Sequence, residues 1–185
     1  MTPSAPPLPT LSVEISIAEA GWLDAVGQPG DIAERAAMAA FEGAAGDWLT
    51  APSAEAGIRL TGDAEVHDLN RRYRDRDQPT NVLSFPGHDE ADRQRLPAGA
   101  PLMLGDVVVA LETVLAEAAA EKKVPADHLS HLVVHGMLHL LGFDHMEESE
   151  AVGMERLETQ ILAGLGVDDP YRLVAPARSG AADLS

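Results

Sequence analysis

Three histidines in the second half of the chain are spaced as ligands of one metal ion: His135, His139 and His145. On an α-helix, residues four apart lie one turn apart on the same face, so the first two imidazoles can reach a single ion. Gly142 can take the left-handed conformation that ends a helix, and His145 is then free to return as a third ligand. Three neutral nitrogen ligands with an open fourth position are typical of a catalytic zinc site. The spacing therefore predicts one zinc ion, although the same ligands also accept nickel or cobalt.

The spacing by itself leaves two other interpretations. A histidine pair four apart on a helix is, in isolation, more often a pair of ordinary surface or core residues; the third histidine and the glycine favour the metal. The pattern H-x-x-x-H-x-x-G-x-x-H also matches metzincin metalloproteases, which carry a Glu general base directly after the first histidine. Here that position is Gly136. Because a positioned base contributes ~10²–10⁴ in rate, its absence argues against peptide hydrolysis.

A second candidate region lies upstream, where arginines are concentrated. Four of the chain's 13 cationic residues fall close together: Arg71, Arg72, Arg74 and Arg76. Taken alone, this cluster is more typical of a solvated helix end, where arginines suit the helix dipole and pair with Asp75 or Asp77. A link to phosphate chemistry needs further evidence.

The elements that must position these residues alternate irregularly between strand and helix. Apolar patterns predict strands over 11–17, 58–61, 81–85 and 107–109. Helical periodicity and capping residues predict helices over 31–48, 63–73, 112–123, 125–141 and 151–165. The valine run at 107–109 is typical of a strand buried on both faces. This order predicts an α+β fold in which a small mixed sheet of about four strands packs with about five helices, one central helix carrying the histidines.

The composition bounds the class of protein. The 185 residues include 13 Lys+Arg and 30 Asp+Glu, giving a formal charge of −17, and the length predicts one domain over 11–173. The absence of cysteine excludes disulfides, Cys-containing zinc fingers, iron–sulfur clusters and thiol nucleophiles. Residues 1–10 are rich in proline and predict a disordered leader, and 174–185 a flexible tail. We expect a cytoplasmic protein, since no secretory signal or membrane-spanning stretch is evident.

Three sequence blocks carry a resemblance to a known family. They are YRDRDQPTNVLSFP, LGDVVV and HLVVHGMLHLLGFDH. Through these blocks, the chain closely resembles the YbeY family of bacterial endoribonucleases over about residues 59–171. Members of this family act in ribosomal RNA maturation. The resemblance implies a zincin-like fold in which His135, His139 and His145 hold zinc, and it implies that Arg74 is a functional residue of the active cleft. The guanidinium is a planar, permanently charged fork that matches phosphate.

The function implied by the resemblance is a zinc-dependent endoribonuclease that prefers single strands and trims precursor ribosomal RNA. Zinc would either lower the pKa of bound water to about 7 or polarise a phosphoryl oxygen while a ribose 2′-OH attacks. The expected partners are ribosomal RNA, the small ribosomal subunit and assembly factors, with no membrane and no DNA. The alternative is a ribosome-assembly binding factor whose metal is mainly structural. The charge of −17 predicts weak, salt-sensitive affinity for naked RNA, with substrate delivered by a partner.

Polar residues beside the motifs each carry a structural and a functional interpretation. His131, one turn before His135, is either a hydrogen-bonded helix residue or a contact to a zinc ligand or to RNA. Asp144 either orients an imidazole or caps a loop, and Asp106 either caps a turn or braces the site. His88 is expected on a mobile loop. Three residues either line the cleft or are ordinary strand-end residues: Thr80, Asn81 and Ser84.

Overall fold

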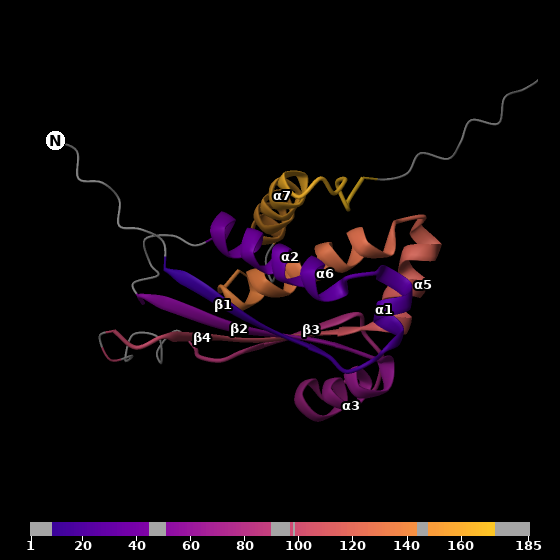
Figure 1. Ribbon diagram of the computed structural model, residues 1–185, viewed down its shortest axis with the longest axis horizontal. Helices are drawn as coiled ribbons and strands as arrows, with labels where there is room; N and C mark the ends of the chain where they lie inside the picture. Colours follow the sequence, from indigo (N-terminus) through magenta and orange to yellow (C-terminus); the bar gives the residue numbers. More distant parts are fainter. Residues whose placement is uncertain (1–8, 45–50, 90–96, 98, 144–147, 173–185) are drawn as a thin grey trace, which may run out of the picture.

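The computed structural model of the chain describes residues 9–44, 51–89, 97, 99–143 and 148–172. Within these ranges, six helices and four strands form a layered α+β arrangement (Figure 1). The predicted α+β class and strand number are confirmed, whereas the expected five helices are one too few. The additional helix is α1 (Gly21–Val26), which has no side-chain cap. It is held instead by a tertiary contact, because the fully buried Trp22 donates from Nε1 to the carbonyl oxygen of Thr61, 3.0 Å away.

The sheet has the strand order β1-β2-β4-β3. Its strands are β1 (Thr10–Ile17), β2 (Ser53–Thr61), β3 (Val82–Pro86) and β4 (Leu102–Ala110). The first, second and fourth are parallel, and β3 pairs antiparallel with β4. The valines at 107–109 are buried, as their continuous run predicted. Strand β2 begins five residues earlier than expected. The apolar pattern did not indicate its first half, because this half turns only Ala54 and Ala56 to the core and lacks large apolar residues.

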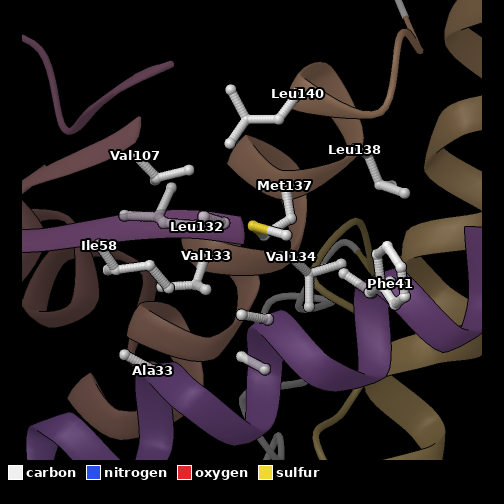
Figure 2. Packing of buried hydrophobic residues seen from close by; sticks show 14 of the residues in the cluster. Ala33, Phe41, Ile58, Val107, Leu132, Val133, Val134, Met137, Leu138 and Leu140 are labelled. Atoms are coloured by element: carbon white, nitrogen blue, oxygen red, sulfur yellow. The ribbon is translucent and has the colours of Figure 1, made fainter. Parts of the chain in front are cut away.

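Helices cover the two faces of the sheet unequally. The remaining helices are α2 (Pro29–Ala44), α3 (Asp63–Arg74), α5 (Leu111–Glu121), α6 (Pro125–Leu140) and α7 (Glu148–Gly164). Helices α2 and α6 pack together on one face, α7 packs against both, and α3 lies on the opposite face (Figure 1). The main core fills the space between the sheet and the α2–α6 layer, where Figure 2 shows Phe41, Val107 and Met137 among its buried residues. The core is mostly aliphatic.

Two glycines determine how α6 lies and where it ends. A Cβ atom added at Gly136 would lie 2.6 Å from Cγ1 of Val107, so the missing side chain lets the helix approach β4 closely. At the other end, Gly142 has a φ of 95°, as its type predicted, and the amide of Phe143 donates to the carbonyl oxygen of Leu138 at 3.0 Å. The chain therefore turns back directly after the helix.

Helix α3 begins without a side-chain cap of its own. The N-cap is Gly62, and the Asp63 carboxylate instead accepts from the amide and hydroxyl of Thr113 on α5, at 2.9 and 2.8 Å. In return, the Asp63 amide donates to the Glu112 carboxylate at 2.8 Å. The first turns of α3 and α5 therefore each accept a hydrogen bond from a free backbone amide of the other. Local capping rules do not predict this pairing, because it joins two separate helices.

The predicted boundaries of the domain, at residues 11 and 173, fall close to the ends of the described part of the chain. Strand β1 begins at Thr10, the last residue of the predicted leader. Residues 1–8 and 173–185 lie outside the described part. Among the helices that are described, none combines the length and the apolarity needed to cross a membrane.

Candidate active site

The imidazoles of His135 and His139 converge at one point beside α6. Their Nε2 atoms lie 3.1 Å apart, with the rings nearly perpendicular. This follows from local geometry, because a spacing of four residues places both side chains on one face of the helix.

Each of these two rings is held from behind through its Nδ1 atom. Nδ1 of His135 lies 2.6 Å from Oε1 of Glu158 on α7, and Nδ1 of His139 lies 3.0 Å from the carbonyl oxygen of Phe143. A carbonyl oxygen and an ionised carboxylate only accept hydrogen bonds, so both Nδ1 atoms must donate. In the neutral rings, both Nε2 atoms then present lone pairs.

This arrangement fits a metal ion. Two nitrogen ligands of a tetrahedral zinc, each at ~2.0–2.1 Å, lie roughly 3.3 Å apart, which is close to the separation seen here. Two lone pairs this close repel each other unless a cation lies between them. Within the described residues no group of three His, Cys, Asp or Glu could hold a metal. The predicted third ligand, His145, and the neighbouring Asp144 lie outside those residues.

A cleft of about 700 Å³ brings the histidines together with the arginine segment. One wall includes His135 and His139, and the other is formed by the end of α3, the following loop and β3. Arg74 lines this second wall, where its Nη2 donates to the carbonyl oxygen of Ser84 at 2.7 Å. Arg76 also lines the cleft. The two sequence motifs, about 60 residues apart, therefore form one site.

The other two arginines of the cluster behave as the solvated-helix interpretation predicted, although with a different partner. Nη2 of Arg71 and Nε of Arg72 lie 3.1 and 2.9 Å from the carboxylate of Asp68. Both arginine side chains are mostly exposed, and neither lines the cleft. The cluster thus divides into a paired, solvated half and a half that faces the histidines.

Other polar candidates divide in a similar way. Thr80 and Ser84 line the cleft, and the buried Ser84 hydroxyl donates to the carbonyl oxygen of Gly136 at 3.2 Å. Asn81 does not line it, because its Nδ2 donates to Glu117 at 2.9 Å. His88 is half-buried just after β3 and is also absent from the cleft walls.

Asp106 belongs to a different part of the molecule. It lines a hollow of about 560 Å³ together with Tyr73, Arg59 and Glu65 of the α3 side. Because α6 packs on the other face of the sheet, this aspartate does not brace the histidine site. The interpretation of Asp106 as a support of the histidines is therefore wrong.

Glu158 connects the site to the last helix and to the C-terminal turn. Burial alone would raise the pKa of this carboxyl, but hydrogen bonds from His131, His135 and Tyr171 outweigh burial and lower the pKa to about 2. The Tyr171 hydroxyl donates to Oε2, and burial and the adjacent carboxylate raise the pKa of that tyrosine. Nε2 of His131 lies 3.5 Å from the same oxygen. The carboxylate is therefore ionised and surrounded by donors.

The chain also resembles known proteins over most of its length. The family model described as Endoribonuclease YbeY matches residues 31–166. The chain belongs to the YbeY family. The Endoribonuclease YbeY of Azorhizobium caulinodans is 51% identical, with 89% of this chain and 99% of that protein covered. The Endoribonuclease YbeY of Paramagnetospirillum magneticum is 50% identical, with 88% and 96% covered. The solution structure of a Thermotoga maritima protein has a TM-score of 0.52 at 20% identity, covering 87% of this chain and 99% of that one, and supports the fold alone.

Sequence reasoning missed several groups of this YbeY-family site. They are the carboxylate of Glu158, the hydroxyl of Tyr171 and the backbone carbonyls of Phe143 and Ser84. Backbone carbonyls carry no sequence signal. Glu158 did carry one, because it lies four residues after Met154, on the apolar face of the last helix, where a charged residue is unusual.

Proposed function

We propose that the chain is a zinc-dependent endoribonuclease that prefers single-stranded RNA and processes precursor ribosomal RNA in the cytoplasm. One observation carries the proposal: the Nε2 atoms of His135 and His139 converge in the same cleft that Arg74 lines. A metal site beside a guanidinium suits a reaction in which a phosphodiester gains negative charge. The names of the relatives point to the same chemistry.

The proposed division of labour assigns the metal to the histidines and the phosphate to Arg74. When bound, zinc would supply Lewis-acid chemistry to the phosphodiester or to the attacking group. His135, His139 and the predicted third ligand His145 would hold it. The Ser84 carbonyl accepts from one Nη of Arg74 and so orients the planar fork, while the other N–H groups can donate to phosphate oxygens.

The packing at Gly136 disfavours the alternative of a metalloprotease. A Cβ there would approach Cγ1 of Val107 to 2.6 Å and Oγ of Ser84 to 3.2 Å. A glutamate at this position would therefore need the helix to move away from β4. The general base of the metzincins is missing, and the helix packing leaves no space for it.

The cleft supports a single-stranded substrate, and the overall charge supports its delivery by a ribonucleoprotein partner. The His135 side chain is only 25% exposed, so the reactive bond must enter the cleft, which a flexible single strand does more readily than a duplex. The net charge of −17 opposes tight binding of free RNA. We therefore place substrate delivery with the small ribosomal subunit and its assembly factors.

The test is cleavage of an end-labelled single-stranded RNA by purified protein, with the matching duplex alongside. His139→Ala removes a proposed ligand, and Arg74→Ala removes the proposed phosphate contact, which we expect to lower the rate by ~10²–10³. The matched control is Arg72→Ala, because Arg72 lies on the same helix, pairs with Asp68 and does not line the cleft. This control should cleave like the parent protein.

Equal cleavage by the parent, His139→Ala and Arg74→Ala would refute the proposal and indicate a contaminating nuclease. If the parent binds one metal but cleaves no RNA, while a chelator unfolds it or releases it from the small subunit, the binding-factor alternative replaces the enzyme.

A further inference from the structure

Glu158 is unusual among the charged residues of this protein. Among the described residues it is the only Asp, Glu, Lys or Arg that is buried, and its side chain has no exposed surface. Withdrawing a carboxylate from water is unfavourable, and an apolar residue of similar size is often more stabilising at such a position. Burial by itself therefore does not explain this residue.

The contacts of the carboxylate point to the histidine site. Oε1 lies 2.6 Å from Nδ1 of His135, and Oε2 accepts the Tyr171 hydroxyl, with His131 at 3.5 Å. Tyr171 is itself held in a turn, because its amide donates to the Asp169 carboxylate at 2.9 Å. Oε1 thus fixes one side of His135, the side opposite to the nitrogen that faces His139, while Tyr171 holds Oε2.

We propose that Glu158 is a positioning residue that holds His135 in the tautomer with hydrogen on Nδ1, so that Nε2 is presented to the metal, and that Tyr171 holds Glu158 in turn. The proposal rests on the metal-binding role given above. Glu158 does not bind the ion itself, since it lies behind the imidazole. A carboxylate behind a ligating imidazole also makes that imidazole a stronger base, and loss of such a partner typically weakens metal affinity by 10–100-fold.

The experiment compares Glu158→Gln with the matched control Glu155→Gln in the full-length protein. Both variants remove one carboxylate from α7, but Glu155 is exposed and lies one turn away. Zn²⁺ affinity is measured by competition with a chromophoric chelator, and Co²⁺ absorption reports the ligand geometry. Nitrogen NMR of the metal-free protein reads the tautomer of His135 directly. None of these measurements depends on RNA cleavage.

We expect Glu158→Gln to bind Zn²⁺ about 10–100-fold more weakly and to change the Co²⁺ spectrum. The preference for Nδ1–H should weaken, because a neutral amide oxygen is a poorer acceptor than a carboxylate. Glu155→Gln should match the parent in all three. Unchanged affinity and tautomer in a folded Glu158→Gln protein would overturn the proposal, as would a parent that binds no Zn²⁺. If the parent binds Zn²⁺ with this dependence on Glu158 but cleaves no RNA, the proposed enzyme fails while the positioning role stands.

A second variant decides the matter if Glu158→Gln does not fold. Tyr171→Phe removes one donor to the carboxylate at a residue that is 41% exposed, so the fold should persist. A loss of Zn²⁺ affinity in this variant, smaller than about tenfold, supports the proposal. Parental affinity and a parental His135 tautomer in Tyr171→Phe would refute it.

Discussion

The close approach of α6 to β4 at Gly136 gives the sharpest test of how the site is built. We consider Gly136→Ala, which adds one methyl group. Its Cβ would lie 2.6 Å from Cγ1 and 3.0 Å from Cγ2 of Val107, and 3.2 Å from Oγ of Ser84. Carbon atoms pack best at ~3.5–4.0 Å, so the overlap with Val107 is about 1 Å. Because both γ carbons are too close, rotation of the valine side chain does not relieve the contact.

The expected energy follows from two opposing effects. Alanine favours a helix over glycine by about 1 kcal/mol, whereas overpacking a well-filled core costs about 1–3 kcal/mol. Val107 has no exposed surface and lies in the central strand β4, so it cannot move outward. We therefore expect Gly136→Ala to be destabilised by up to about 2 kcal/mol, with the His135–His139 pair displaced from the cleft.

Gly153→Ala is the matched control, because Gly153 lies inside α7 and an added Cβ there has no atom within 4 Å. This control gains the same helix preference without the overlap and should be stabilised by up to about 1 kcal/mol. The difference between the two variants isolates the overlap. It is measured as the free energy of unfolding in urea, with the denaturant slope checked for each protein.

Equal stability of Gly136→Ala and Gly153→Ala would show that the overlap with Val107 is not the cause. A double-mutant cycle with Val107→Ala provides a second check. If the contact with Val107 is the cause, the two substitutions in Gly136→Ala/Val107→Ala should be coupled by about 0.5–3 kcal/mol, the shortened valine accommodating the new methyl group. Simple additivity would place the strain elsewhere.

Three further predictions concern charge, burial and metal. Hydrogen bonds from Arg59 and Thr61 lower the pKa of Glu65 below 4.5. These bonds therefore stabilise the folded protein fully above pH 4.5, and this stabilisation is lost as the pH falls through the folded-state pKa. Glu65→Gln should therefore be less stable than the parent at pH 7 by at most about 1 kcal/mol, since the Arg59–Glu65 pair is partly exposed. The difference in unfolding free energy should shrink towards pH 3, and a constant difference in urea melts would contradict this. Trp22→Phe leaves the Thr61 carbonyl without its indole donor and should lose about 1–3 kcal/mol of unfolding free energy, whereas an unchanged urea midpoint would show that the bond is dispensable. Zn²⁺ at a hundred times its Kd should stabilise the parent by about 2.7 kcal/mol and leave the melting temperature of His139→Ala unchanged, and an equal shift in both would place the metal elsewhere.

The local features of the site could be predicted from the sequence. The convergence of His135 and His139 depends only on a spacing of four residues in a helix, and Gly142 ends that helix because glycine readily adopts a positive φ. The valine run of β4 indicated a strand covered on both faces for a similarly local reason. Helix α1 was not expected from the sequence, and it is held by a contact with a distant segment.

Only the tertiary structure decided which distant groups complete the site. Arg74 lines the histidine cleft because β3 pairs with β4 while α6 packs on the same strands, bringing together segments that are far apart in the chain. The sequence determined that the last helix has an apolar face, but not that Glu158 on this face meets Nδ1 of His135. Periodicity describes one helix at a time, whereas partners across helices depend on packing angles and distances that the whole core determines.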